Sequence, residues 1–312
     1  MKHLLLFFAL LPMLLAPAVS HAQTQQTDLQ KANIIGKVKS VSEHLKSAYD
    51  DRTILYLYNQ QGNIVSETYS YKGKFSVKTV SEYDTRGYLV TRKDVDSAGK
   101  TLRKETFVND ARGNVLSATG NDVEAKTKWT ATYKRDARGN VLEYLKKDAL
   151  TGKMIEKTSY TYDSKGTVLS ENNTTVYGPD SKSVNRTTST PTYNAQGLIE
   201  KLEETFSSNF LDGTDYITTD YRYNAAGKVI YSRVVRLNIA SYGSSERETV
   251  TTWDDNGNIL KEEKTDDMDD VITDTYTYLF DETGNWTKCM HITEYTTTKP
   301  KEVVTERGVE YY

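Results

Sequence analysis

Cys289 and His291 are the two side chains in this sequence whose types and spacing most resemble a catalytic pair. They stand two positions apart, so in a β-strand they would share one face. A thiol beside an imidazole is the pattern of a nucleophile with its general base. The same spacing also fits a partly buried cysteine next to a strand histidine with a structural role, and we favour that interpretation. His44 is too distant in the sequence to extend the pair by local spacing.

The other common signatures of catalysis are missing from the sequence. It contains no phosphate-binding loop, dinucleotide fingerprint or metal-binding histidine motif. We therefore predict that the protein is not an enzyme and carries no cofactor. One alternative stays open, because a carboxylate pair hidden among the 43 acidic residues could do acid–base chemistry. That alternative requires a concave pocket in which two carboxylates with perturbed pKa values face each other.

The densest acidic run spans residues 266–270 and reads Asp-Asp-Met-Asp-Asp. Four carboxylates at a hairpin tip could bind calcium, which takes roughly six to eight oxygen ligands. Such a run also keeps a sheet edge solvated and guards it against aggregation. We favour the solvated loop and predict no metal site.

Aromatic side chains are the remaining candidates for binding. Exposed tyrosines or tryptophans can stack on sugar rings or hold a partner chain. Aromatics recur at two positions of a repeat, so we expect these residues to pack against neighbouring repeats as a core. Trp129 lies outside that repeat pattern, which makes it a weak candidate for a surface binding residue.

A turn that recurs nine times organises the chain. In each copy an Asp or Asn stands three residues before a glycine, and the glycines are 25 to 31 residues apart. The Asx side chain can accept backbone N–H groups of the turn, and the glycine can take the left-handed conformation that closes a hairpin. These structural turn glycines are Gly62, Gly87, Gly113, Gly139, Gly166, Gly197, Gly227, Gly257 and Gly284.

The residues around each turn predict β-strands. An aromatic precedes the Asx directly in seven copies, and a second aromatic stands two positions earlier in six copies. All nine copies have an apolar residue two positions after the glycine, and seven have another at the third position. Strands rich in Tyr, Thr and Val on both sides of a turn indicate an antiparallel array of hairpins. We interpret residues 34–49, the most ambiguous segment, as the first strand pair.

The number of strands constrains the shape of the sheet. Nine hairpins and a leading strand give about 19 strands, whereas open twisted sheets rarely exceed about ten. Neighbouring apolar residues after each glycine would point to opposite faces, so both faces would be partly covered. We therefore predict an all-β array of antiparallel hairpins, rolled or spiralled into a curved sheet or shell.

The motif around the turn resembles a known repeat. Residues 160–166 read Tyr-Thr-Tyr-Asp-Ser-Lys-Gly, and residues 221–227 read Tyr-Arg-Tyr-Asn-Ala-Ala-Gly. Both are similar to the YD repeat of RHS-type proteins, and the resemblance covers roughly residues 54–290. It implies a long β-sheet that spirals into a shell in secreted or surface proteins.

The chain departs from the large members of that family. Its period is longer than theirs, and it lacks the Asp-Pro-x-Gly motif that ends their shells. It is more similar to the small stand-alone secreted YD-repeat proteins of Bacteroidota.

Composition and the first residues predict location and exclude some partners. Residues 1–22 have the basic start, apolar run and small-residue cleavage site of a secretory signal peptide. The mature chain, 23–312, would then be a single β-repeat domain without a transmembrane helix, exported across the inner membrane. It would be periplasmic, associated with the outer membrane, or extracellular. The balance of 40 basic and 43 acidic residues provides no basic surface for nucleic acid, and one cysteine excludes a disulfide framework.

These observations favour a non-enzymatic cell-envelope protein whose rigid repeat surface binds a glycan or another protein. One alternative is a structural or accessory component of a secreted machine. Another is an outer-membrane β-barrel, which needs a continuous apolar face toward lipid. Residues 142–147 place polar and apolar side chains on both faces of a strand, and the mean hydropathy is −0.64.

Overall fold

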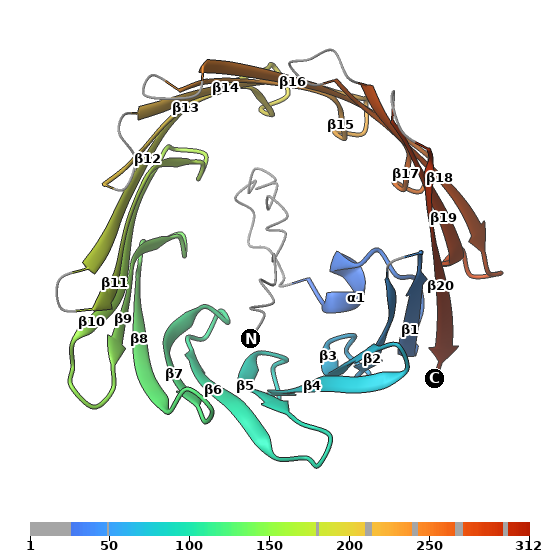
Figure 1. The fold of residues 1–312 in the computed structure, drawn as a ribbon. Coiled ribbons are helices and arrows are strands. Elements are labelled where there is room, and N and C mark those ends of the chain that lie inside the picture. Colours follow the sequence, from blue (N-terminus) through green and yellow to red (C-terminus); the bar gives the residue numbers. More distant parts are fainter. Residues whose placement is uncertain are drawn as a thin grey trace.

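A computed structural model describes residues 26–48, 50–178, 181–209, 214–238, 243–265, 271–295 and 299–312. The described chain contains one short helix and twenty strands arranged as a ring (Figure 1). The elements are α1 (Asp28–Lys31), β1 (Val38–Lys46), β2 (Asp51–Tyr58), β3 (Ile64–Tyr71), β4 (Lys74–Tyr83), β5 (Leu89–Val95), β6 (Thr101–Asn109), β7 (Val115–Asp122), β8 (Thr127–Arg135), β9 (Val141–Asp148), β10 (Met154–Tyr162), β11 (Val168–Gly178), β12 (Ser181–Tyr193), β13 (Ile199–Ser208), β14 (Thr214–Tyr223), β15 (Val229–Asn238), β16 (Gly243–Trp253), β17 (Ile259–Thr265), β18 (Val271–Phe280), β19 (Trp286–Tyr295) and β20 (Lys301–Tyr311).

The sheet closes on itself. Each strand pairs antiparallel with its neighbour in the chain, and β1 pairs with both β2 and β20. The structure therefore confirms the antiparallel hairpin array but corrects its shape from a rolled or spiralled sheet to a closed barrel. The count of about 19 omitted the C-terminal strand β20, which supplies the partner that β1 needs for closure.

The repeated turns have the predicted geometry. In each, the Asx side chain accepts backbone N–H groups two and four residues further along, as Asp84 Oδ1 does from Arg86 and Tyr88 at 2.9 Å. The glycine that follows is left-handed, with φ of 85° at Gly87. All nine turn glycines share this positive φ, so a side chain there would be strained. The local prediction of the hairpins is confirmed.

A β-bulge follows every one of these turns and was not expected. Tyr83 pairs with Leu89, but Glu82 pairs with Thr91, so Val90 is the extra residue. The same register shift recurs in all nine hairpins. Bulges increase the twist and bend of a strand, so a bulge at the same level of each repeat curls the sheet into a barrel.

The prediction that apolar residues after the glycine partly cover both faces holds in some repeats and fails in others. At the third position Val65, Val90, Leu169 and Ile230 are half-buried. Leu116, Leu142 and Leu260 are instead 44%, 40% and 39% exposed. These residues occupy the bulge, where the alternation of faces is interrupted.

The segment 34–49 is also different from its prediction as a strand pair. It contributes the single strand β1, and it is preceded by the helix α1. Thr27 and Gln30 form a capping box that starts the helix, since each accepts a hydrogen bond from the backbone of the other. The one turn of helix places Leu29 against the sheet.

The helix identifies the inner face of the barrel. In Figure 1, α1 lies inside the ring next to β1. Leu29 joins Val38, Val41 and Tyr58 in a buried cluster, and these strand residues therefore face inward. Since directly paired residues share a face, the register assigns the inner residues of the other strands in turn. A barrel with this many strands is wide enough to enclose a lumen.

Three predictions remain untested by the described residues or by this fold. The signal peptide and the acidic run 266–270 lie outside the described residues. The boundary of the mature domain at residue 23 lies there too. Among the described residues, no helix is long and apolar enough to cross a membrane.

Candidate functional site: the lumen of the barrel

One ring of inner-face residues has a structural role. In this ring, the side chain of the residue directly before the Asx donates a hydrogen bond to the preceding hairpin. The acceptor is the backbone carbonyl two residues after the turn glycine of that preceding hairpin. Tyr83 Oη donates to the Ile64 carbonyl at 2.9 Å, and Trp253 Nε1 donates to the Val229 carbonyl at 2.7 Å. The same bond is made by Asn109, Arg135, Tyr162 and Tyr223. These residues join the hairpins together, as the core interpretation of the aromatics predicts.

A second ring of aromatics lies at the next inner-face position of each strand, two residues before the first ring and further from the turn. Its members are Tyr56, Phe107, Tyr133, Tyr160, Tyr221 and Tyr278, all half-buried. Partial burial disfavours the phenolate and raises the pKa of Tyr56 and Tyr278 above the usual value for tyrosine. These tyrosines are therefore neutral at physiological pH and can act as hydrogen-bond donors with an apolar ring face.

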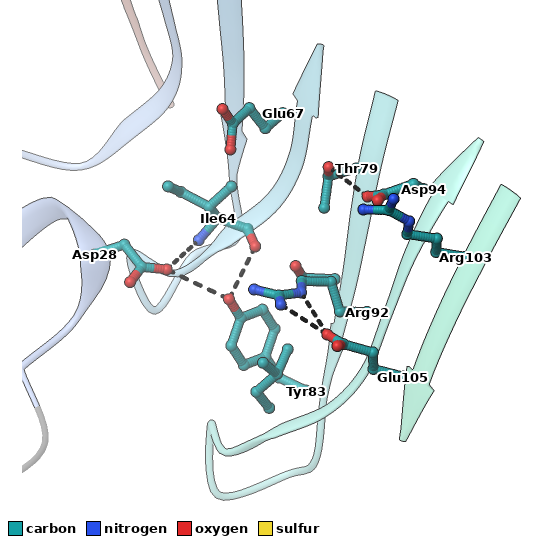
Figure 2. A pocket seen from close by; sticks show the side chains of 11 residues that line it. Asp28, Ile64, Glu67, Thr79, Tyr83, Arg92, Asp94, Arg103 and Glu105 are labelled. Atoms are coloured by element: carbon teal, nitrogen blue, oxygen red, sulfur yellow. Dashed lines mark hydrogen bonds and ion pairs between the residues drawn. The ribbon is translucent and has the colours of Figure 1, made fainter. Parts of the chain in front are cut away.

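A pocket in the lumen lies between α1 and strands β3–β6 (Figure 2). Its volume is about 470 Å³, within the range of small-ligand sites. The lining combines apolar, hydroxyl and charged side chains. They are Asp28, Ile64, Glu67, Thr79, Ser81, Tyr83, Leu89, Arg92, Asp94, Arg103 and Glu105.

The helix α1 closes one side of this pocket. Asp28 Oδ2 accepts the Ile64 backbone N–H at 2.8 Å and the Tyr83 hydroxyl at 3.3 Å. The Leu29 backbone N–H donates to the Gly62 carbonyl at 3.0 Å. Burial and the Asp28 carboxylate raise the pKa of Tyr83 to about 12, so its hydroxyl keeps its proton and its bond.

Most charged groups of the pocket are paired within the wall. Arg92 contacts Glu105 through Nε at 3.0 Å and Nη2 at 2.7 Å. Arg103 Nε donates to Asp122 at 2.8 Å, and Thr79 donates to Asp94 at 2.8 Å.

Glu67 is different, because among the described residues it makes neither a hydrogen bond nor an ion pair. Desolvation and the nearby Asp94 raise the pKa of Glu67, while Arg92 acts in the opposite direction.

A different wall of the lumen, formed by β10–β12, is rich in amides and hydroxyls. Asn173 Nδ2 donates to Thr158 Oγ1 at 2.9 Å and to Glu156 Oε1 at 3.2 Å. Ser183 donates to Asn185 at 3.3 Å. No lysine or arginine stands at the inner-facing positions of this wall in the described residues.

Trp129 also faces the lumen, rather than the outer surface. It is paired with Gly120 on β7, and a Cβ at Gly120 would stand 2.1 Å from Trp129 Cε2. Lys146 Nζ lies 4.5 Å from the centre of the tryptophan ring on the other side. The indole is thus held flat against the wall by a glycine that the repeat analysis did not single out. Its role in binding stays a prediction.

The predicted Cys–His pair has other partners. His291 Nε2 lies 2.8 Å from Asp274 Oδ1, and its ring stacks on Tyr276 at 4.5 Å. The Cys289 thiol lies near Tyr278. Burial raises the pKa of this thiol and so disfavours the thiolate form that a nucleophile needs. His44 pairs with Asp51 on the outer face at 3.0 Å. The contacts of Cys289 and His291 fit their structural interpretation.

The outer face is polar. Thr106 pairs with Thr91 and Thr119, and Thr119 pairs in turn with Thr130, so four neighbouring strands show a row of threonines. On β16, four of the five residues whose register places them on the outer face are polar. They are Ser244, Glu246, Glu248, Val250 and Thr252. Strands in contact with lipid would instead alternate apolar residues outward.

Neither a family model nor a curated protein matches this sequence. Three solved structures are similar in shape. A porin-like protein from Bacteroides uniformis is 14% identical, with 88% of this chain and 96% of that chain covered and a TM-score of 0.36. A porin-like protein from Bacteroides vulgatus is 10% identical, with 89% and 99% covered and a TM-score of 0.35. The TcdB2–TccC3–Cdc42 structure is 14% identical over 82% of this chain and 15% of that chain, with a TM-score of 0.37.

These likenesses support no conclusion about what this chain does, because all three TM-scores are below 0.5. The resemblance of the turn motif to YD repeats therefore stays a prediction.

The sequence analysis missed the residues that line the pocket. Glu67 and Arg92 stand five residues after a turn glycine, at an inner-face position that varies from repeat to repeat. The full set at this position is Glu67, Arg92, Ala118, Tyr144, Glu171, Leu202, Ser232, Glu262 and Cys289. Aligning the nine repeats on their glycines reveals the variation, but the sequence does not say which face these residues occupy.

Proposed function

We propose that this protein is a non-enzymatic binding protein of the cell envelope whose ligand, a glycan, lies in the lumen of the barrel. The observation that carries the proposal is the contrast between the two faces. The inner face presents half-buried tyrosines, amides and carboxylates, whereas the outer face is covered by Thr, Ser, Lys and Glu.

The inner face suits a hydroxyl-rich ligand. Tyrosine rings provide flat apolar surfaces for sugar rings, and their hydroxyls can bond to the ligand. Amide and carboxylate groups such as Asn173 and Glu156 can fix its orientation. A repeat fold with a constant framework and a variable inner position can present different groups at successive levels of an extended chain.

A binding screen with matched variants tests this proposal. Purified barrel is titrated with a panel of neutral and charged polysaccharides by isothermal titration calorimetry. Asn173→Ala and Trp129→Ala on the inner face should each weaken the binding of a hit. Asn172→Ala and Tyr216→Ala on the outer face should leave it unchanged. Binding that is lost only in the outer-face variants would overturn the proposal.

A second candidate function is a barrel in the outer membrane. The closed sheet without edges favours it, and so does the length of strands such as β14 and β18, each 10 residues. A spanning strand needs about 9–11 residues. The polar outer face argues against contact with lipid.

Extraction of the protein from isolated envelopes separates the two candidates. We expect release by a carbonate or urea wash without detergent. Retention until detergent is added would replace our proposal with the membrane barrel.

A further inference from the structure

We propose that the pocket between α1 and strands β3–β6 binds a protonated amine carried by a small organic molecule or by a residue of a longer chain. The inference deepens the proposed function, on which it rests, by naming the chemical class that this part of the lumen recognises.

The first argument is the charge of the pocket. Its lining holds four carboxylates, Asp28, Glu67, Asp94 and Glu105, against the two guanidinium groups of Arg92 and Arg103. The formal charge of the lining is thus −2. A concave site with excess negative charge and low-dielectric walls attracts cations more strongly than an exposed surface would.

The second argument is which carboxylates remain available. Both guanidinium groups are occupied, Arg92 by Glu105 and Arg103 by Asp122. Asp28 pairs with Lys31 at 3.3 Å and holds the helix in place. Glu67 and Asp94 are left without a cation within ion-pair distance among the described residues, and both line the same pocket. Figure 2 shows the two residues above the Arg92–Glu105 pair.

The third argument is the shape and chemistry of the opposite side. Ile64, Leu89 and the ring of Tyr83 provide an apolar surface. Thr79, which pairs with both Glu67 and Asp94, and Ser81, which pairs with Arg92, add hydroxyls to this wall. A volume of about 470 Å³ is far larger than a bare metal ion needs and fits an organic group. An ammonium group at Glu67 and Asp94, with its carbon skeleton against Tyr83 and Leu89, would use both halves of the pocket.

Burial of an unpaired carboxylate gives a physical reason for such a ligand. Desolvation and Asp94 raise the pKa of Glu67, so the surroundings of this side chain disfavour its charged form. An ammonium group beside Glu67 would stabilise the carboxylate by providing a counter-charge. The other charged groups around Glu67 are Asp28 on α1, Arg92 and Asp94 on β5, and Arg103 and Glu105 on β6.

In the test, the full barrel is titrated with each of four probes at neutral pH and low ionic strength. Isothermal titration calorimetry measures the binding. Cadaverine presents an amine on an alkyl chain, and glucosamine presents one on a sugar. Glucose and calcium chloride are the neutral and metal controls. At least one amine should bind tenfold or more tightly than glucose, and the preferred amine identifies the source. Binding of both amines no tighter than that of glucose, or binding of calcium in place of both amines, would overturn the inference.

Two matched variants locate the amine site. Glu67→Gln should weaken amine binding tenfold or more. Glu171→Gln removes a half-buried carboxylate at the same position of another repeat and should leave amine binding unchanged. Thermal unfolding of both variants shows that the barrel is intact. Amine binding that survives Glu67→Gln contradicts the inference.

The outcomes also separate this inference from the proposed function. If the barrel binds a polysaccharide in the lumen but neither amine, the amine site alone is contradicted. If the barrel binds neither polysaccharides nor amines, the amine site and the proposed function are both contradicted.

Discussion

The seam where β1 meets β20 and the wall formed by β10–β12 use the same inner face in opposite ways. At the seam Val38 and Val41 are completely buried, and they pack with Leu29 and Tyr58 in an apolar cluster. On the β10–β12 wall the buried inner-face residues are hydroxyl groups, such as Thr158, which Asn173 contacts.

The difference follows from how each pair of strands is connected. The strands β10, β11 and β12 follow one another in the chain, so their pairing closes short loops. No turn joins β1 to β20. Residues that pair across this seam, such as Glu43 and Arg307, are 264 positions apart in the chain. Closing a longer loop costs more conformational entropy. Burial of apolar side chains at the seam offsets that cost, whereas a hairpin-linked wall can direct polar groups into the lumen.

Arg307→Ala should have the largest effect on stability. Its side chain is 9% exposed, pairs with Glu43 and lies over the Trp286 ring. Removal of one partner from a fully buried pair costs about 3–5 kcal/mol, and the loss here should lie toward the lower end because Glu43 is 25% exposed. Chemical denaturation measures the loss, and Arg86→Ala, which breaks an exposed pair with Asp84, should cost under about 1 kcal/mol. Equal losses in the two variants would mean that the seam has no special role.

Asn173→Ala should have the next largest effect. It leaves the buried hydroxyl of Thr158 without its amide partner, at a cost of about 1–3 kcal/mol. Its neighbour Asn172 points outward, where it accepts from Arg186, so Asn172→Ala should cost less. The two variants differ by one position in the chain and by which face of the barrel they alter. If Asn172→Ala proves the more damaging, the polar wall is not the ordered element that we describe.

Gly120→Ala should displace Trp129 from the wall. The new Cβ would overlap the indole, and a forced shift of this kind costs about 1–3 kcal/mol. The tryptophan fluorescence spectrum should change in the folded protein. Gly99→Ala strains a left-handed turn where nothing lies within 4 Å of the new Cβ, so it is the control for destabilisation without contact with the indole. An unchanged spectrum would show that the ring does not rest on Gly120.

Glu67→Gln should give the smallest effect on stability, and the effect should be a gain. The pKa of Glu67 is raised in the folded protein, so the stability associated with its protonated form is lost as pH rises through that pKa. The glutamine side chain does not ionise, so the variant does not lose this stability as pH rises. The thermal midpoint of the variant should therefore exceed that of the parent more at pH 7 than at pH 4. A larger gain at pH 4 would contradict the assigned sign.

Local features of the fold could be predicted from the sequence, and long-range ones could not. The Asx–Gly turns are short-range, so Asp84 and Gly87 indicate their own geometry. The i, i+2 spacing of Tyr160 and Tyr162 correctly places both on one face. Closure depends on the pairing of β1 with β20, and no local pattern contains that information.

The site was harder to predict because the sequence does not distinguish inner from outer positions. Glu67 lies in an ordinary polar strand, and only the register and the helix α1 place it in a pocket. The bulge also interrupts the alternation of faces, so Leu116 suggested a covered second face that is exposed. Trp129 was noticed for lying outside the repeat, but the glycine that supports it, Gly120, was not.

Hydroxyl-radical footprinting with a glucosamine hexamer tests the central claim, that the inner face is the binding face. Tyr160 and Tyr221 line the lumen, and Tyr216 and Tyr231 lie on the outer face. The account predicts that saturating ligand reduces oxidation of the inner tyrosines and leaves the outer ones unchanged. Protection confined to Tyr216 and Tyr231, or no protection at any of the four, would contradict it.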